Sequence, residues 1–261
     1  MTLFLHEIKR GRIALIAWSA VVSFMLFISI LIYPEMTSQM GDISEMFANM
    51  GAFSDAFGMD SVNFGEFSGY FAIEFGNTMG LAGGVFAALL GMAALADEEG
   101  NRTAEFLLTH PISRVQIVLQ KLLSIMARLL MFNVAVFVMA LLAMLIIGES
   151  AQASEVALAF VGSLLLQLEV ASIAFGASAF LRSGNLAIGI GASIGLYVLN
   201  IFANLTEELE FLKYITPYGY ADATVIVSDG AITVKYLIPG ILLTALGIAA
   251  AFWQYKRKDI A

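Results

Sequence analysis

The sequence has no cysteine and only two histidines among its 261 residues. Without cysteine the chain has no disulfide bonds and no thiolate metal sites, and redox chemistry gives no guide to its compartment. His6 and His110 both fall outside the long apolar runs, so we expect no imidazole within a membrane. Ser193, in the run Gly-Ala-Ser-Ile-Gly, therefore lacks the base that an intramembrane serine protease requires.

Charged residues are also scarce and unevenly placed. They make up 13% of the chain, whereas hydrophobic residues make up 60%, well above the roughly 45–50% of ordinary soluble domains. This composition predicts an integral membrane protein. Residues 34–68 contain acidic residues but no lysine or arginine, and all basic residues except Lys213 and Lys235 lie on or near the termini and alternate loops. The positive-inside rule then predicts cytoplasmic termini and a cytoplasmic segment 96–121, with segments 34–68, 148–155 and 205–235 outside.

Six apolar runs are long enough to cross a bilayer, which needs about 20 helical residues. Before them, residues 2–12 alternate apolar and charged side chains in the pattern of a short amphipathic helix lying in the headgroup region. We therefore predict a single all-α transmembrane domain over residues 1–261. Its spans are expected at 13–33, 69–95, 125–147, 156–181, 185–204 and 236–253.

The segment 96–121 is dense in charge and has clear helix boundaries. Asn101 is suited to cap a short helix, which Pro111 ends. Ser113 and Gln116 have the spacing of a capping box, which predicts that a second helix starts at Arg114. That helix runs to about Ile147 and is longer than a bilayer requires, so its first turns are expected to project into the cytoplasm.

These residues resemble a known family. The run Asp97-Glu-Glu-Gly-Asn-Arg-Thr-Ala-Glu-Phe-Leu-Leu, followed by Pro111-Ile-Ser-Arg and by Lys121, is similar to the loop between the second and third spans of ABC-2 type transporter permeases. The Pro-centred aromatic segment 212–223 and the basic end 256–258 also match that family. The resemblance implies a type V ABC exporter-like fold, with an elbow helix at 2–12 and a cytoplasmic coupling helix in 96–121.

The resemblance also implies partners. The chain is expected to bind two copies of an ATP-binding subunit and to pair with a second permease, identical or related, among membrane lipids and without nucleic acid. No Gly-Lys dipeptide occurs, so a phosphate-binding P-loop is excluded. We expect no directly bound cofactor or metal and no enzymatic activity of its own, because ATP and Mg would be used by the partner. The implied location is the plasma membrane, with a bacterial source expected.

The contact with the ATP-binding subunit is expected in the coupling segment, where apolar side chains would fill a groove and charged ones would fix the orientation. The alternative is a capped loop that only joins two spans. Arg114, Lys121 and Arg128 share one stripe of the third helix, which either reaches the ATPase or the acidic run at 97–99, or anchors to lipid phosphates. The proposed contact residues are Glu98, Glu99, Arg102, Glu105, Phe106, Leu107 and Arg114.

Three polar side chains are predicted inside the membrane: Asn133, Glu169 and Asn200. A charged carboxylate there costs roughly 2.5–3.5 kcal/mol, so Glu169 is expected to be protonated, paired or facing a cavity. A proton or cation relay, a substrate contact and a structural hydrogen bond to Asn133 or Asn200 remain open. An ion exporter that uses Glu169 and a passive scaffold are therefore alternatives to an exporter of drugs, antimicrobial peptides or lipids.

Small residues and aromatics complete the pattern. Gly76, Gly80 and Gly84 share one helix face, as do Gly191 and Gly195, and such spacing favours close helix packing. The stripe of Met36, Met40, Ile43, Phe47 and Met50 is typical either of an exit surface for hydrophobic cargo or of a helix resting on the outer leaflet. Tyr214, Tyr218 and Tyr220 similarly fit either the exit or an interfacial aromatic belt.

Overall fold

The computed structural model describes residues 2–38, 56, 62–63, 65–100, 112–149, 153–181 and 185–258, and these residues are helical wherever they have regular structure. The elements are α1 (Thr2–Arg10), α2 (Arg12–Ser38), α5 (Phe67–Thr78), η1 (Met79–Gly83), α6 (Gly84–Gly100), α8 (Arg114–Ile147), α9 (Ala153–Ser178), α10 (Leu186–Leu205), η3 (Glu207–Tyr214), α11 (Tyr218–Ala221), α12 (Ala223–Asp229) and α13 (Val234–Arg257).

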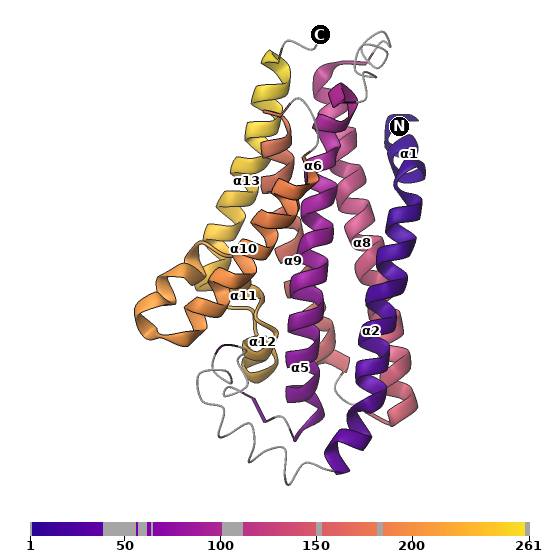
Figure 1. The fold of residues 1–261 in the computed structure, drawn as a ribbon, viewed down its shortest axis with the longest axis vertical. Coiled ribbons are helices and arrows are strands. Elements are labelled where there is room, and N and C mark those ends of the chain that lie inside the picture. The colour runs from indigo at the N-terminus through magenta and orange to yellow at the C-terminus, as the bar shows by residue number, and fades with distance from the viewer. Residues whose placement is uncertain are drawn as a thin grey trace.

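Six helical stretches in the described residues are long and apolar enough to cross a membrane, which confirms the predicted fold class. They are α2, the continuous run α5–η1–α6, α8, α9, α10 and α13. The run α5–η1–α6 is the most buried and lies at the centre, whereas α2, α10 and α13 expose most of their surface. Figure 1 shows the long helices side by side in one elongated bundle.

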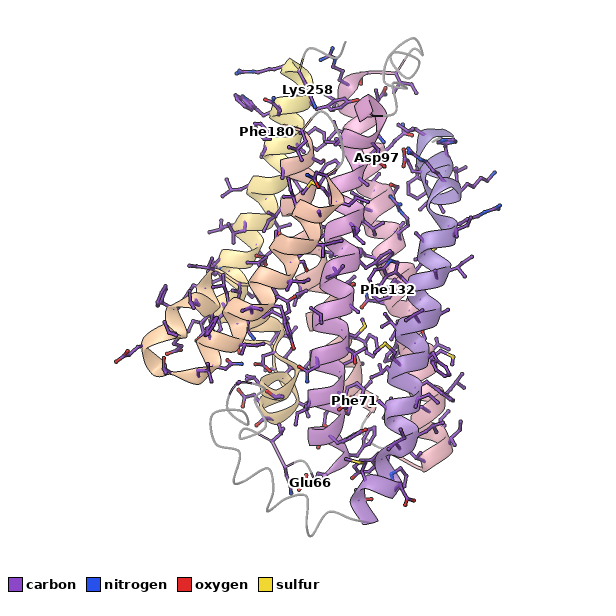
Figure 2. All side chains as sticks on the ribbon, viewed as in Figure 1. Glu66, Phe71, Asp97, Phe132, Phe180 and Lys258 are labelled. Carbon is purple, nitrogen blue, oxygen red and sulfur yellow. The ribbon has the colours of Figure 1, made fainter. Side chains whose placement is uncertain are left out.

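The two ends of this bundle differ. At one end lie α1, the last turn of α6, the start of α8 and the last turn of α13 (Figure 1). We call it the basal end. The start of α5 lies at the opposite, distal end, and the short helices α11 and α12 pack beside α5 and α9. Figure 2 shows Asp97 and Lys258 at the basal end, Phe132 in the middle and Glu66 at the distal end.

The boundaries of α8 follow local sequence chemistry. Gln116 N–H donates to Ser113 Oγ at 3.3 Å, and Ser113 N–H donates back to Gln116 Oε1 at 3.1 Å, so the predicted capping box is present. At the other end Gly148 adopts a left-handed conformation, with φ of 87°, and stops the helix. At about 1.5 Å per residue this 34-residue helix is about 51 Å long, clearly more than the hydrocarbon core of about 30 Å.

Aromatic side chains form much of the core between helices. Trp18 of α2, Phe86 of α6 and Phe132 of α8 follow one another with ring centroids 5.6 and 5.1 Å apart. Nearer the distal end, Phe75 of α5 lies 4.6 Å from Phe160 of α9. At two helix crossings a glycine lets the backbones approach closely. A Cβ on Gly91 would lie 2.3 Å from Ala171 O, and one on Gly247 would lie 2.5 Å from Ser172 O. These contacts hold α6 and α13 tightly against α9.

Candidate functional site

The strongest polar contact at the basal end joins α1 to α8. Lys121 Nζ lies 2.8 Å from Glu7 Oε1, and both side chains are buried, with 2% and 9% of their surface exposed. One turn earlier, Phe4 N–H donates to Gln120 Oε1 at 3.1 Å. Because a buried charge is tolerated only with a partner, Glu7 fixes the position of α1 along α8.

Electrostatics at this contact favour the ionised pair. Burial alone would raise the pKa of Glu7, but the charge and hydrogen bond of Lys121, helped by Arg10 and Arg128, outweigh it and hold the pKa below its usual value. Glu7 is therefore a carboxylate at neutral pH. On α1, Glu7 faces the protein, whereas Leu5 is exposed.

Two arginines extend the contact. Arg128 of α8 is 8% exposed, and its guanidinium donates to the backbone carbonyl and hydroxyl of Ser124 at 3.2 and 3.3 Å. A Cβ on Gly11 would lie 2.5 Å from Arg128 Nη1, so the absence of a side chain there makes room for the guanidinium. Arg10 Nη2 lies 3.7 Å from Asp97 Oδ2 near the end of α6. We call Glu7, Arg10, Asp97, Lys121 and Arg128 the elbow cluster, and it connects α1, α6 and α8.

A second set of contacts at the basal end holds α13. Arg114 Nη1 donates to the carbonyl oxygens of Tyr255, Lys256 and Lys258 at 3.3, 3.3 and 2.6 Å. Helix C-termini leave carbonyls unpaired, so one guanidinium here satisfies several of them. Lys258 Nζ in turn donates to the carbonyl of Leu181, just after α9. The first residue of α8 is thus linked to the ends of α13 and α9.

Polar side chains inside the bundle form two separate contacts. Asn133 of α8 donates to Gln167 Oε1 of α9 at 2.6 Å, and Gln167 donates to Ser163 Oγ at 3.0 Å. Glu169, also on α9, accepts a 2.7 Å hydrogen bond from the hydroxyl of Tyr220 on α11. The partner of Glu169 is therefore Tyr220, not Asn133 or Asn200, the neighbours that we expected from the sequence.

Comparison with known families identifies the chain. The family model described as ABC-2 family transporter protein matches residues 1–260. The chain belongs to this family. The comparison with curated proteins gave no match.

Membership of this family indicates the role of the whole chain. The ABC-2 chain is the membrane component of a transporter, a permease subunit, and the family implies an ATP-binding subunit as partner. The described residues contain no group of three or more histidine, cysteine or acidic side chains that would hold a metal ion. The described side chains of the elbow cluster and Arg114 join helices to one another at the basal end.

Most of the predicted ATPase-contact residues of this ABC-2 permease lie outside the described part of the chain. Arg102, Glu105, Phe106 and Leu107 fall in 101–111, and the side chains of Glu98 and Glu99 are not described. Arg114 is described, and it binds the end of α13. Of its stripe, Lys121 and Arg128 are buried against α1, so the interpretation of these two as anchors to lipid phosphates is wrong.

The predicted glycine faces have different surroundings. On the central helix, Gly80 and Gly84 lie against Tyr218, and Gly76 lies against Ala223, so this face packs on the α11–α12 segment. A Cβ on Gly191 or Gly195 of α10 would meet nothing within 4 Å. Within the described chain, therefore, the α10 face has no packing neighbour of its own.

Sequence reasoning missed several residues that the structure brings together. Glu7 and Asp97 were assigned to the headgroup region and to an acidic run, because nothing local marks a carboxylate that pairs with a helix far away in the sequence. Tyr218 and Tyr220 are 5% and 2% exposed, so the interpretation as an interfacial belt is wrong for both, whereas Tyr214 is 40% exposed. The seven-residue spacing of Lys121 and Arg128 was the one available indication of a buried stripe.

Proposed function

We propose that this permease subunit belongs to an ATP-driven exporter and that the ATP-binding subunit docks at its basal end. In this proposal both termini and segment 96–121 face the cytoplasm of a bacterial cell. Two ATP-binding subunits serve a pair of permeases, identical or related. The observation that carries the proposal is the buried pair of Lys121 and Glu7, which ties the elbow helix α1 to α8 at the end of the bundle where α6 stops and α8 starts.

The basal contacts support a path for force. Movement of the partner would push on α1 and on the segment between α6 and α8. The elbow cluster links α1 to the long helix α8, and Arg114 links the first turn of α8 to the end of α13. Since α8 is one uninterrupted helix, displacement of its basal turns tilts its distal half as well. That tilt would open a cleft toward the outside between the two permeases.

The proposed cargo is hydrophobic or amphipathic: a drug, an antimicrobial peptide or a lipid. The support is the composition of residues 36–50, where methionine and phenylalanine recur at helical spacing on the expected outer side. An ion exporter centred on Glu169 has less support, because one oxygen of that carboxylate is bonded to Tyr220 and holds α11 in place.

Docking is tested by replacing Phe106 and Leu107 with aspartate. If these side chains fill a groove of the ATP-binding subunit, each aspartate must lose its hydration when the subunit binds. This costs binding free energy, so the affinity should fall by at least tenfold. The measurement is co-purification of the co-expressed ATP-binding subunit with the tagged permease. Phe211→Asp is the matched control, since Phe211 is 56% exposed on η3, away from the basal end, and its variant should retain the partner. Equal retention in all variants would reject the docking site.

Sidedness is tested separately by single-cysteine labelling, for which the cysteine-free chain provides a clean background. Glu105→Cys should react with a membrane-impermeant maleimide only after the membrane is opened. Phe211→Cys should react in intact cells. Labelling of Glu105→Cys from outside would show that the topology is the reverse of the proposed one and would refute the docking proposal.

A further inference from the structure

A small, partly open pocket with several polar side chains lies between helices of the bundle. It occupies about 50 Å³ between the α5–η1 region, α9, α10 and the α11–α12 segment. At about 10–15 Å³ per water, this is room for a few water-sized particles, whereas drug-sized ligands occupy about 300–1,000 Å³. The cavity is therefore too small for the proposed cargo. Part of its wall is η1, a π-helical stretch at Met79–Gly83, and such stretches are frequent at functional sites.

Several hydroxyl groups around this cavity point their hydrogens at protein acceptors. Tyr197 donates to Asn77 Oδ1 at 2.8 Å, Tyr218 donates to Gly80 O at 3.0 Å, and Thr224 Oγ1 donates to Asp222 Oδ1 at 2.7 Å. These bonds leave oxygen lone pairs, rather than hydrogens, for a ligand. The amides of the lining asparagines still offer donors, but they carry no formal charge.

The residues that line the pocket carry negative but no positive charge among those the structure describes. Among the described lining residues, Asp222 is the one charged side chain, and none is lysine, arginine or histidine. Asp222 is half-buried, and beside the apolar bundle its carboxylate attracts a cation more strongly than it would in bulk water. Glu169 does not line this cavity, so the site is distinct from the Tyr220 contact.

An unpaired acceptor gives a second indication. Asn200 Oδ1 is buried and accepts no hydrogen bond from the described part of the chain, although Asn200 lines the cavity. Buried acceptors without a protein partner commonly belong to an unseen ion or water. Carboxylate and amide oxygens are the ligands that hard cations prefer, and one carboxylate suits a monovalent rather than a divalent ion.

We propose that this cavity binds one alkali-metal cation, with Asp222 supplying the charge and the side-chain oxygens of Asn77 and Asn200 supplying neutral ligands. The cation holds the α11–α12 segment against α5 and α10 near the distal end. This inference does not depend on the ATP-binding subunit, since every group that it uses belongs to this chain.

The test uses the purified full chain in detergent. Its unfolding temperature is measured while NaCl or KCl replaces N-methyl-D-glucamine chloride at constant ionic strength, and binding of radioactive sodium is measured in parallel. A cation that binds the folded state raises the unfolding temperature once its concentration exceeds its dissociation constant, and the rise then follows the logarithm of the concentration. The binding of radioactive sodium itself should saturate. We expect this rise for the wild type with at least one of the two salts.

Asp222→Asn is the decisive variant, because asparagine still accepts from Thr224 N–H and caps α12 but removes the charge. Its half-saturating cation concentration should rise at least tenfold. Asp229→Asn, at the exposed other end of α12, is the matched control and should respond like the wild type. Should Asp222→Asn fail to fold, Asn200→Ala is held to the same criterion. A wild type that does not distinguish alkali cations from N-methyl-D-glucamine, or a variant that binds as the wild type does, would show that the cavity holds only water.

Discussion

The hydroxyl of Tyr220 donates a 2.7 Å hydrogen bond to Glu169 Oε2, and this bond joins the four-residue helix α11 to the middle of α9. Both side chains are almost fully buried. Next to them a Cβ on Gly240 would lie 2.4 Å from the same carboxylate oxygen, so α13 also approaches this point. Three segments therefore meet at one buried carboxyl group.

Tyr220→Phe should destabilise the permease by about 1–3 kcal/mol, because it leaves a buried acceptor without its donor. Glu169→Gln should be close to the wild type, since an amide oxygen still accepts from Tyr220. The measurement is the free energy of unfolding in mixed detergent micelles. A Glu169→Gln variant that folds normally but abolishes transport would instead favour the ion relay over a structural role.

The elbow cluster gives a prediction about a buried ion pair. Glu7→Leu should destabilise the chain by about 3–5 kcal/mol, because it removes the carboxylate that accepts the 2.8 Å hydrogen bond from the buried Lys121 ammonium. The double variant Glu7→Leu, Lys121→Met should recover most of this loss, since an apolar pair of similar size removes the buried ammonium together with its carboxylate. Unfolding in mixed micelles measures both effects.

The chain contains a matched control for that experiment. Lys235 and Glu210 form a 3.2 Å ion pair whose side chains are 52% and 49% exposed. Exposed pairs contribute little, so Lys235→Met should leave the unfolding transition unchanged. Equal losses from Glu7→Leu and Lys235→Met would contradict the importance assigned to burial.

The sequence was sufficient for the fold but not for these contacts. Six apolar runs, the positions of the helices and the Ser113–Gln116 capping box depend on local patterns, and each was predictable. The second span nevertheless continues to Gly100, which places Asp97 on a helix rather than in a loop. Pairs such as Glu7 with Lys121, or Tyr220 with Glu169, depend on which helix faces which, and a single sequence does not encode that in any local spacing.

Lowering the pH distinguishes the contribution of the Glu7 charge to stability from the contribution of its packing. Its pKa lies below the ordinary value of 4.5. Such a group stabilises the folded state above its unfolded pKa and loses that contribution as the pH falls through its folded pKa. The difference in unfolding temperature between the wild type and Glu7→Gln should therefore be constant from about pH 7 to about pH 5.5. It should shrink once the pH falls below the ordinary glutamate pKa of 4.5. A difference that persists unchanged to about pH 3 would assign the effect to shape rather than charge.

The two glycine faces differ in what a side chain would meet, and this difference separates folding from assembly. Gly247→Leu would push against the backbone of Ser172 and Ile173 on α9, so α13 must move away and the chain should be strongly destabilised. A Cβ at Gly191 would meet nothing within 4 Å in the described chain, so Gly191→Leu should leave the unfolding transition of the single chain nearly unchanged. If the α10 face packs against a second permease, that same variant should lose the dimer, because small residues allow close helix approach. Chemical cross-linking in membranes and size-exclusion chromatography measure the assembly, and a Gly191→Leu variant that still forms the wild-type dimer would place the permease interface on another face.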